Sequence, residues 1–175
     1  MTAIVVYESI WGNTATLAQA IGRGLGPKTQ VLSTSEATPD VVAEAGLLVL
    51  GAPVHSYNRP EFVTIQVGRD PEDEVEGAAP GSEFVLMRDW IRGLRGPAVP
   101  VAVFEIRIGE LPGEGGAREV LKALAEGGWD LVVPAASFQM ESHPISPGPG
   151  GWINSAELDR ARAWGASLAE AVRRG

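Results

Sequence analysis

The sequence AIVVYESIWGNTATLAQAI, residues 3–21, joins an apolar run to a helix-like pattern through a short polar loop. In that loop Gly12 permits a tight turn, while Ser9, Asn13 and Thr14 supply side-chain hydrogen-bond donors. A loop between a strand and a helix also lies beside the free amides of the helix N-terminus. The stretch therefore predicts an anion cradle, most simply for a phosphate group. The alternative is that Asn13 or Thr14 only caps the helix.

Two familiar phosphate-binding motifs are missing from this junction. A P-loop requires a lysine after its last glycine, and no lysine follows Gly12. A dinucleotide fingerprint requires G-x-G-x-x-G directly after the first strand, which is also missing. We interpret Gly22, Gly24 and Gly26 as terminators of the helix. A phosphate here would belong to a mononucleotide held mainly by neutral donors.

Apolar runs and helix-period segments alternate five times along the chain. Most of the runs are near-continuous, which is typical of strands buried on both faces of a parallel sheet. The alternation predicts a single α/β domain over residues 1–175, a three-layer, doubly wound, five-stranded parallel sheet. The expected strands are residues 3–7, 30–32, 47–50, 99–104 and 131–133, and the expected helices are residues 14–25, 40–45, 83–94, 117–125 and 155–173, the last capped by Asn154.

Composition excludes several classes of function. With 14 basic and 22 acidic residues the formal charge is -8, which disfavours nucleic acid and anionic membranes as partners. The chain has no cysteine, and His55 and His143 are its only imidazoles, so we expect neither disulfides nor a metal site. There is no secretory signal pattern and no apolar run near the ~20 residues that span a bilayer, so we expect a cytoplasmic protein.

A second loop, GAPVHSYNRP at residues 51–60, follows the third expected strand. Tyr57 offers a flat ring that can stack on a planar ligand. His55 is either a ligand-facing group or an ordinary loop histidine. The connection continues to residue 82 through a proline-containing, acidic segment, and connections of this length are usually functional loops or disordered inserts.

A third loop is expected at FEIRIGELPGEGGA, residues 104–117, after the fourth strand. Its glycines permit close approach of a ligand, and Arg107 is its only cation. Glu105 either takes part in a site or pairs with Arg107 at the surface without a functional role. Since the carboxyl ends of parallel strands meet at one edge of a doubly wound sheet, the three loops are expected to lie together.

Together, YESIWGNT, GAPVHSYNRP, FEIR with its glycine-rich tail, and the closing helix with ELDRARAWG resemble the flavodoxin family, in its actinobacterial flavodoxin-like branch. The resemblance covers nearly the whole chain and implies a five-stranded sheet of order 2-1-3-4-5 that binds FMN non-covalently. It implies three groups of FMN-binding residues: Ser9, Trp11, Gly12, Asn13 and Thr14 at the phosphate; Pro53, Val54, His55, Ser56 and Tyr57 on one side of the flavin ring; and Glu105, Ile106, Arg107, Ile108 and Gly109 on the other.

The function expected from this resemblance is electron transfer by FMN between a reductase and an acceptor with basic surfaces, steered by the acidic charge and without a catalytic residue. One alternative is an NAD(P)H-dependent quinone or FMN reductase, or a protoporphyrinogen-oxidase-type enzyme, in which His55 or Tyr57 orients a substrate. A second is a flavin-free interaction or regulatory domain with the same fold. Trp11 stands where flavodoxins commonly have a hydroxyl residue, and residues 105–109 contain no Tyr or Trp, which favours this second alternative.

Overall fold

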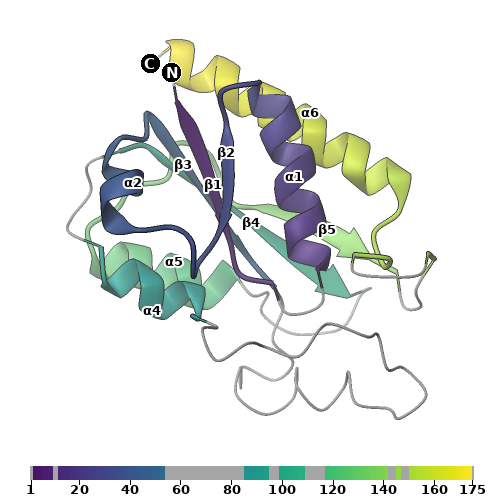
Figure 1. Ribbon diagram of the computed structural model, residues 1–175, viewed down its shortest axis with the longest axis horizontal. Coiled ribbons are helices and arrows are strands. Elements are labelled where there is room, and N and C mark those ends of the chain that lie inside the picture. Colours follow the sequence, from purple (N-terminus) through teal and green to yellow (C-terminus); the bar gives the residue numbers. More distant parts are fainter. Residues whose placement is uncertain are drawn as a thin grey trace.

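The computed structural model describes residues 2–9, 12–53, 85–94, 99–108, 117–141, 145–146 and 150–174. Their strands form one parallel sheet in the order β2-β1-β3-β4-β5, with helices on both faces (Figure 1). This confirms the predicted fold class and strand order. The strands are β1 (Ala3–Tyr7), β2 (Gln30–Ser33), β3 (Leu47–Ala52), β4 (Val101–Ile108) and β5 (Ala136–Met140), and the helices are α1 (Asn13–Leu25), α2 (Pro39–Ala43), α4 (Met87–Arg92), α5 (Ala117–Glu126) and α6 (Ser155–Arg174).

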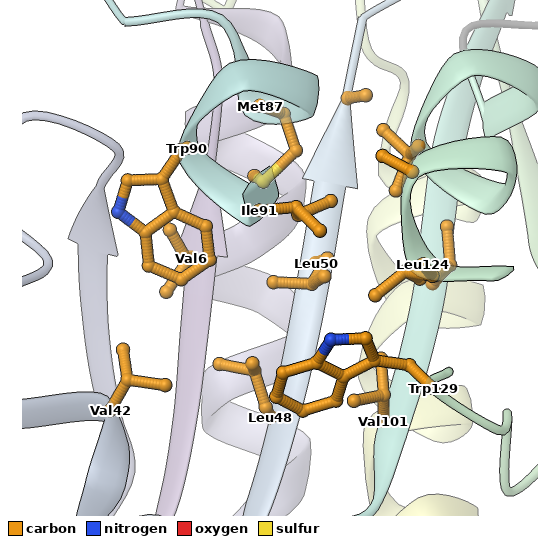
Figure 2. Packing of buried hydrophobic residues seen from close by; sticks show 14 of the residues in the cluster. Val6, Val42, Leu48, Leu50, Met87, Trp90, Ile91, Val101, Leu124 and Trp129 are labelled. Carbon is orange, nitrogen blue, oxygen red and sulfur yellow. The ribbon is translucent and has the colours of Figure 1, made fainter. Parts of the chain in front are cut away.

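Each face of the sheet has its own apolar core. Helices α4 and α5 cover one face, and α1 and α6 pack together over the other (Figure 1). On the first face, Met87 and Ile91 of α4 lie over Leu50 of β3 (Figure 2). Trp90 of α4 is also buried there, and its indole Nε1 donates to the carbonyl of Ala37 at 2.8 Å. Because β1 and β3 are covered on both sides, their sequences are nearly continuously apolar.

Helices α1 and α6 approach closely at two glycines. A Cβ atom on Gly24 of α1 would overlap the carbonyl oxygen of Arg162 in α6, and one on Gly165 of α6 would overlap the carbonyl oxygen of Ile21 in α1. The interpretation of Gly24 as a terminator is therefore wrong, since it lies inside α1 at this contact. Gly22 is likewise inside α1, against Val31, so its interpretation was wrong too.

Helix α1 ends where the last of the three glycines predicted. Gly26 is the C-cap with φ 123°, and its amide donates to the carbonyl of Gly22 at 3.1 Å. The positive φ explains why glycine occupies this position.

The fifth strand lies later in the chain than predicted. Leu131 makes only an isolated bridge to Val101, and Val132 is 40% exposed, so residues 131–133 are not the strand. Pro134 follows, and the strand forms at Ala136–Met140 instead. The prediction was wrong because β5 is an edge strand with an alternating sequence, in which Phe138 is the fully buried side chain. Such a sequence is less apolar than residues 131–133, so its strand pattern is weaker.

The boundaries of β4 and α4 also differ from the predicted ones. β4 begins later and continues past residue 104 to Ile108, because its second half pairs with β5 from Phe104↔Ala136 to Ile108↔Met140. Helix α4 begins at Met87, after Leu86 in an extended conformation, whereas residue 83, where the prediction began, lies outside the described ranges. The predicted cap of α6 is confirmed, since Asn154 Oδ1 accepts from the amide of Glu157 at 2.9 Å.

Candidate functional site

The first predicted loop connects β1 to α1 at the carboxyl edge of the sheet. Gly12 is the residue that precedes the helix, and its φ of 82° places it in the left-handed region that favours glycine. The amide of Thr16 donates to the carbonyl of Gly12 at 2.9 Å, which begins the helical hydrogen bonding. The N-cap position is held by Gly12, and Asn13 and Thr14 lie inside the helix, so the alternative that Asn13 or Thr14 serves only as its cap is wrong.

Several hydrogen-bond donors at this loop have no acceptor in the described part of the chain. The amides of Asn13, Thr14 and Ala15 lie in the first turn of α1, where a helix offers no internal acceptor. The hydroxyl of Ser9 is buried, and it has no hydrogen-bond partner among the described residues. A buried, unpaired donor is costly, so this group of donors fits a ligand that supplies acceptors, such as a phosphate.

The segment after β5 packs against this loop, which the sequence analysis missed. Asn13 is buried, and its Oδ1 accepts from the amide of Trp152 at 3.4 Å. Gly150 has a φ of 79°, and a Cβ atom there would overlap the hydroxyl of Thr16, which itself donates to the carbonyl of Gly12 at 3.0 Å. The contact of this segment with a loop far away in the sequence had no local signal.

Two buried carboxylates lie at the same edge of the sheet. Glu8 follows β1, and its Oε2 accepts from the amide of Met87, the first residue of α4, at 2.7 Å. Glu105 lies in β4, and its Oε2 accepts from the amide of Ala117, the first residue of α5, at 2.9 Å. A negative charge at a helix N-terminus is favourable because of the helix dipole. Neither contact has a local sequence signal, since each joins a side chain in or directly after a strand to the start of a later helix.

Glu105 also forms an ion pair with Arg107, as the second of the two alternatives for Glu105 predicted. Its Oε1 accepts from Arg107 Nε at 2.8 Å and from the hydroxyl of Ser137 at 2.6 Å. The pair is not wholly at the surface, since the Glu105 side chain is only 6% exposed and that of Arg107 is 40% exposed. Burial raises the pKa of Glu105, but the hydrogen bonds from Ser137, Ala117 and Arg107 and the charge of Arg107 outweigh it, so the pKa is lowered.

The structure brings together the described parts of the three predicted loops. β3 lies between β1 and β4, with Gly51 opposite both Tyr7 and Phe104, so the carboxyl ends of the three strands are neighbours. Ser9, Gly12, Asn13 and Thr14 lie after β1, and Pro53 directly follows β3.

The predicted residues around β4 are not in a loop, which corrects the expected position of the third loop. Glu105, Ile106, Arg107 and Ile108 lie within β4. Ile106 is buried in the core under α1 and α6, whereas Glu105 faces α5. Six of the predicted site residues lie outside the described ranges: Trp11, Val54, His55, Ser56, Tyr57 and Gly109. The long connection at residues 56–82 lies outside them as well.

Two properties of the described residues bear on other classes of protein. No helix among them is both long and apolar enough to cross a membrane. Within the same ranges, no three His, Cys, Asp or Glu side chains gather where they could hold a metal ion.

No protein-family model matches the sequence, and no curated protein matches it. Several solved structures, in contrast, are similar to this chain. A flavodoxin from the domain Archaea superposes with a TM-score of 0.63 at 21% identity over 99% of each chain. Oxidised flavodoxin 1 from Bacillus cereus superposes with a TM-score of 0.61 at 14% identity over 97% of this chain and 98% of that chain. The flavodiiron protein from Giardia intestinalis superposes with a TM-score of 0.62 at 14% identity over 99% of this chain and 36% of that chain. From this likeness and the strand order, the chain has the flavodoxin-like fold.

Proposed function

We propose that this protein is a flavoprotein that binds FMN non-covalently and carries electrons between partner proteins. The observation that supports the proposal most directly is the group of hydrogen-bond donors after β1. Within the described part of the chain, the buried hydroxyl of Ser9 and the first amides of α1 have no acceptor. These donors suit the phosphate of a mononucleotide. Several structures of the same fold are flavodoxins, which agrees with this ligand.

The residues present fit an FMN phosphate. Ser9 would donate its hydroxyl, and the amides of Asn13, Thr14 and Ala15 would donate from the positive end of α1. Gly12 gives the turn its left-handed backbone. Glu8 Oε2 accepts from the amide of Met87 at 2.7 Å, on the α4 side of the sheet. The donors proposed for the phosphate are all neutral.

The flavin ring is proposed to lie over the neighbouring ends of β3 and β4, between Pro53 with residues 54–57 and residues 105–109. When bound, FMN supplies one- and two-electron redox chemistry, which the protein tunes through burial, hydrogen bonds and nearby charge. Glu105 and Arg107 are charged groups that β4 brings to this edge, and their ion pair keeps the local charge balanced. The formal charge of -8 favours encounter with basic redox partners.

The first experiment is an absorption spectrum of the purified protein, followed by titration of the flavin-free form with FMN and with riboflavin, which lacks the phosphate. We expect tighter binding of FMN than of riboflavin. Ser9→Ala should weaken FMN about 10-fold or more, because a hydrogen bond to a charged group contributes ~1.5–3 kcal/mol. The variant should leave riboflavin binding unchanged, and Ser167→Ala, on the exposed surface of α6, is the matched control.

Gly12→Ala gives a second test of the phosphate site. Gly26→Ala is its control, because both glycines have positive φ and flank the same helix, so both variants suffer backbone strain. Only Gly12→Ala should weaken FMN. A protein that is colourless and leaves FMN fluorescence unchanged would refute the proposal and favour the interaction domain. Direct oxidation of NAD(P)H by the FMN-loaded protein would instead favour the reductase.

A further inference from the structure

The outer edge of β5 is covered by side chains of α6. β5 is the last strand of the described sheet, and β4 pairs with one of its edges. On its other edge the amide of Gln139 donates to Glu157 Oε2 at 2.8 Å, and the carbonyl of Ser137 accepts from Arg160 Nη2 at 2.6 Å. Glu157 and Arg160 belong to the first two turns of α6. The outward main-chain groups of two alternate residues of β5 are thus bonded to one helix.

The two side chains are held together as a unit. Arg160 Nη2 contacts Glu157 Oε2 at 2.6 Å, and Arg160 Nε donates to Glu157 Oε1 at 3.1 Å, which is a bidentate pair. The guanidinium also lies 4.4 Å from the ring centroid of Phe138, the residue between Ser137 and Gln139. Arg160 therefore covers both the backbone edge and the aromatic side chain of the strand.

The pattern of these hydrogen bonds matches that of a neighbouring strand. In a parallel ladder, one residue of the next strand donates to a carbonyl and accepts from the amide two residues further along. Arg160 donates to the carbonyl of Ser137, and Glu157 accepts from the amide of Gln139. The ion pair takes the place of one residue of a sixth strand.

The sequence of β5 explains why its edge needs cover from another element. Exposed edge strands usually carry charged residues or proline, which prevent pairing with other chains. β5 reads ASFQM and contains neither. Its four-residue counterpart at the other edge, β2, is shorter. Among the residues that the structure describes, the charged side chains that bond to the backbone edge of β5 are those of Glu157 and Arg160.

We propose that the Glu157–Arg160 pair closes the β5 edge against β5 of a second copy of this chain. Two identical strands related by a two-fold axis pair antiparallel, and the same surface serves both copies. With the axis through Phe138, Ser137 of each copy faces Gln139 of the other, and the facing residues exchange both main-chain hydrogen bonds. The two groups that α6 now satisfies are among those that the second copy would use.

The test removes the pair and measures the mass in solution. Glu157→Ala/Arg160→Ala should change the protein from one chain, 18.4 kDa, to a dimer as its concentration rises in analytical ultracentrifugation. The matched control is Glu170→Ala/Arg174→Ala, which removes an ion pair of the same charges from the same helix at an exposed position. The control should stay a single chain. Hydrogen exchange at the Gln139 amide should become faster in the dilute double variant and slow again in the dimer.

A third variant shows whether any association uses β5. Adding Gln139→Pro to the double variant removes the outward amide, and proline is tolerated on the free edge of an edge strand. It should restore the single chain, and circular dichroism checks that each variant is folded. The proposal is overturned if the double variant stays a single chain at every concentration, or if it associates equally well after Gln139→Pro is added.

Discussion

Glu8 and Glu105 each accept a hydrogen bond from the first amide of a helix on the same face of the sheet. Glu8 contacts Met87 of α4 at 2.7 Å, and Glu105 contacts Ala117 of α5 at 2.9 Å. Both carboxylates stand at the carboxyl edge, so they fix the N-termini of two neighbouring helices beside the predicted ligand site. Each satisfies an amide that has no acceptor within its helix and places a negative charge at the positive end of the helix dipole.

This arrangement predicts a pH-dependent contribution of Glu105 to stability. Its folded pKa is lowered, so the contribution is complete above the unfolded pKa of about 4.3 and is lost as the pH falls through the folded pKa. Glu105→Gln should reduce the free energy of unfolding at neutral pH by about 1–3 kcal/mol, because its charged hydrogen bonds are weakened. In urea denaturation the difference from the wild type should shrink as the pH falls below that unfolded pKa. A difference that is constant with pH would contradict the assignment.

The α1–α6 contact predicts an unusual response at Gly24. In most helices Gly→Ala stabilises by up to about 1 kcal/mol. Here the added methyl group would overlap the carbonyl oxygen of Arg162, and forcing an extra methyl group into a well-packed contact typically costs about 1–3 kcal/mol. Thermal denaturation should therefore show a lower Tm for Gly24→Ala. A higher Tm would mean that α1 and α6 separate without cost.

The contact of Gly150 with Thr16 predicts an indirect effect on the proposed phosphate site. Gly150→Ala would displace the Thr16 side chain and the Gly12 carbonyl behind the loop, so FMN affinity should fall about 10-fold, equivalent to about 1.4 kcal/mol. Gly128→Ala is the control, because Gly128 has a similar φ of 73° and open space around it.

Both glycine variants should lose stability from backbone strain, and FMN titration separates them. Equal FMN affinity in the Gly150→Ala and Gly128→Ala variants would show that the segment after β5 does not support the loop.

The Glu105–Arg107 pair predicts the direction of two redox shifts in the FMN-loaded protein. Arg107→Ala leaves the Glu105 carboxylate unopposed, so adding an electron becomes less favourable and the midpoint of the second one-electron reduction should fall. Glu105→Gln/Arg107→Ala removes both charges and should return the midpoint toward the wild-type value. Spectroelectrochemical titration measures both. An unchanged midpoint in Arg107→Ala would place the pair too far from the flavin to act on it.

Much of the fold was predictable because burial leaves a local signal. The core strands β1 and β3 are continuously apolar, and α1, α5 and α6 carry apolar residues at helix spacing, so their positions were predicted within a few residues. β5 was misplaced, because an edge strand with Phe138 as its fully buried side chain has a weaker pattern than the apolar run at residues 131–133. The position of the loop between β1 and α1 was predictable because glycine and small polar residues at a strand-helix junction are a local pattern, and its binding of a phosphate stays a prediction.

By itself, the sequence determined the fold class, the acidic charge and the position of the glycine-containing loop between β1 and α1, because each depends on composition or on residues close together in the chain. Only the tertiary structure decided which partners distant residues acquire. Glu8 reaches Met87, Gly24 meets Arg162, and Glu157 with Arg160 covers β5. These contacts depend on how helices pack on the sheet, and side chains joined only by packing have no periodicity or spacing from which their pairing follows.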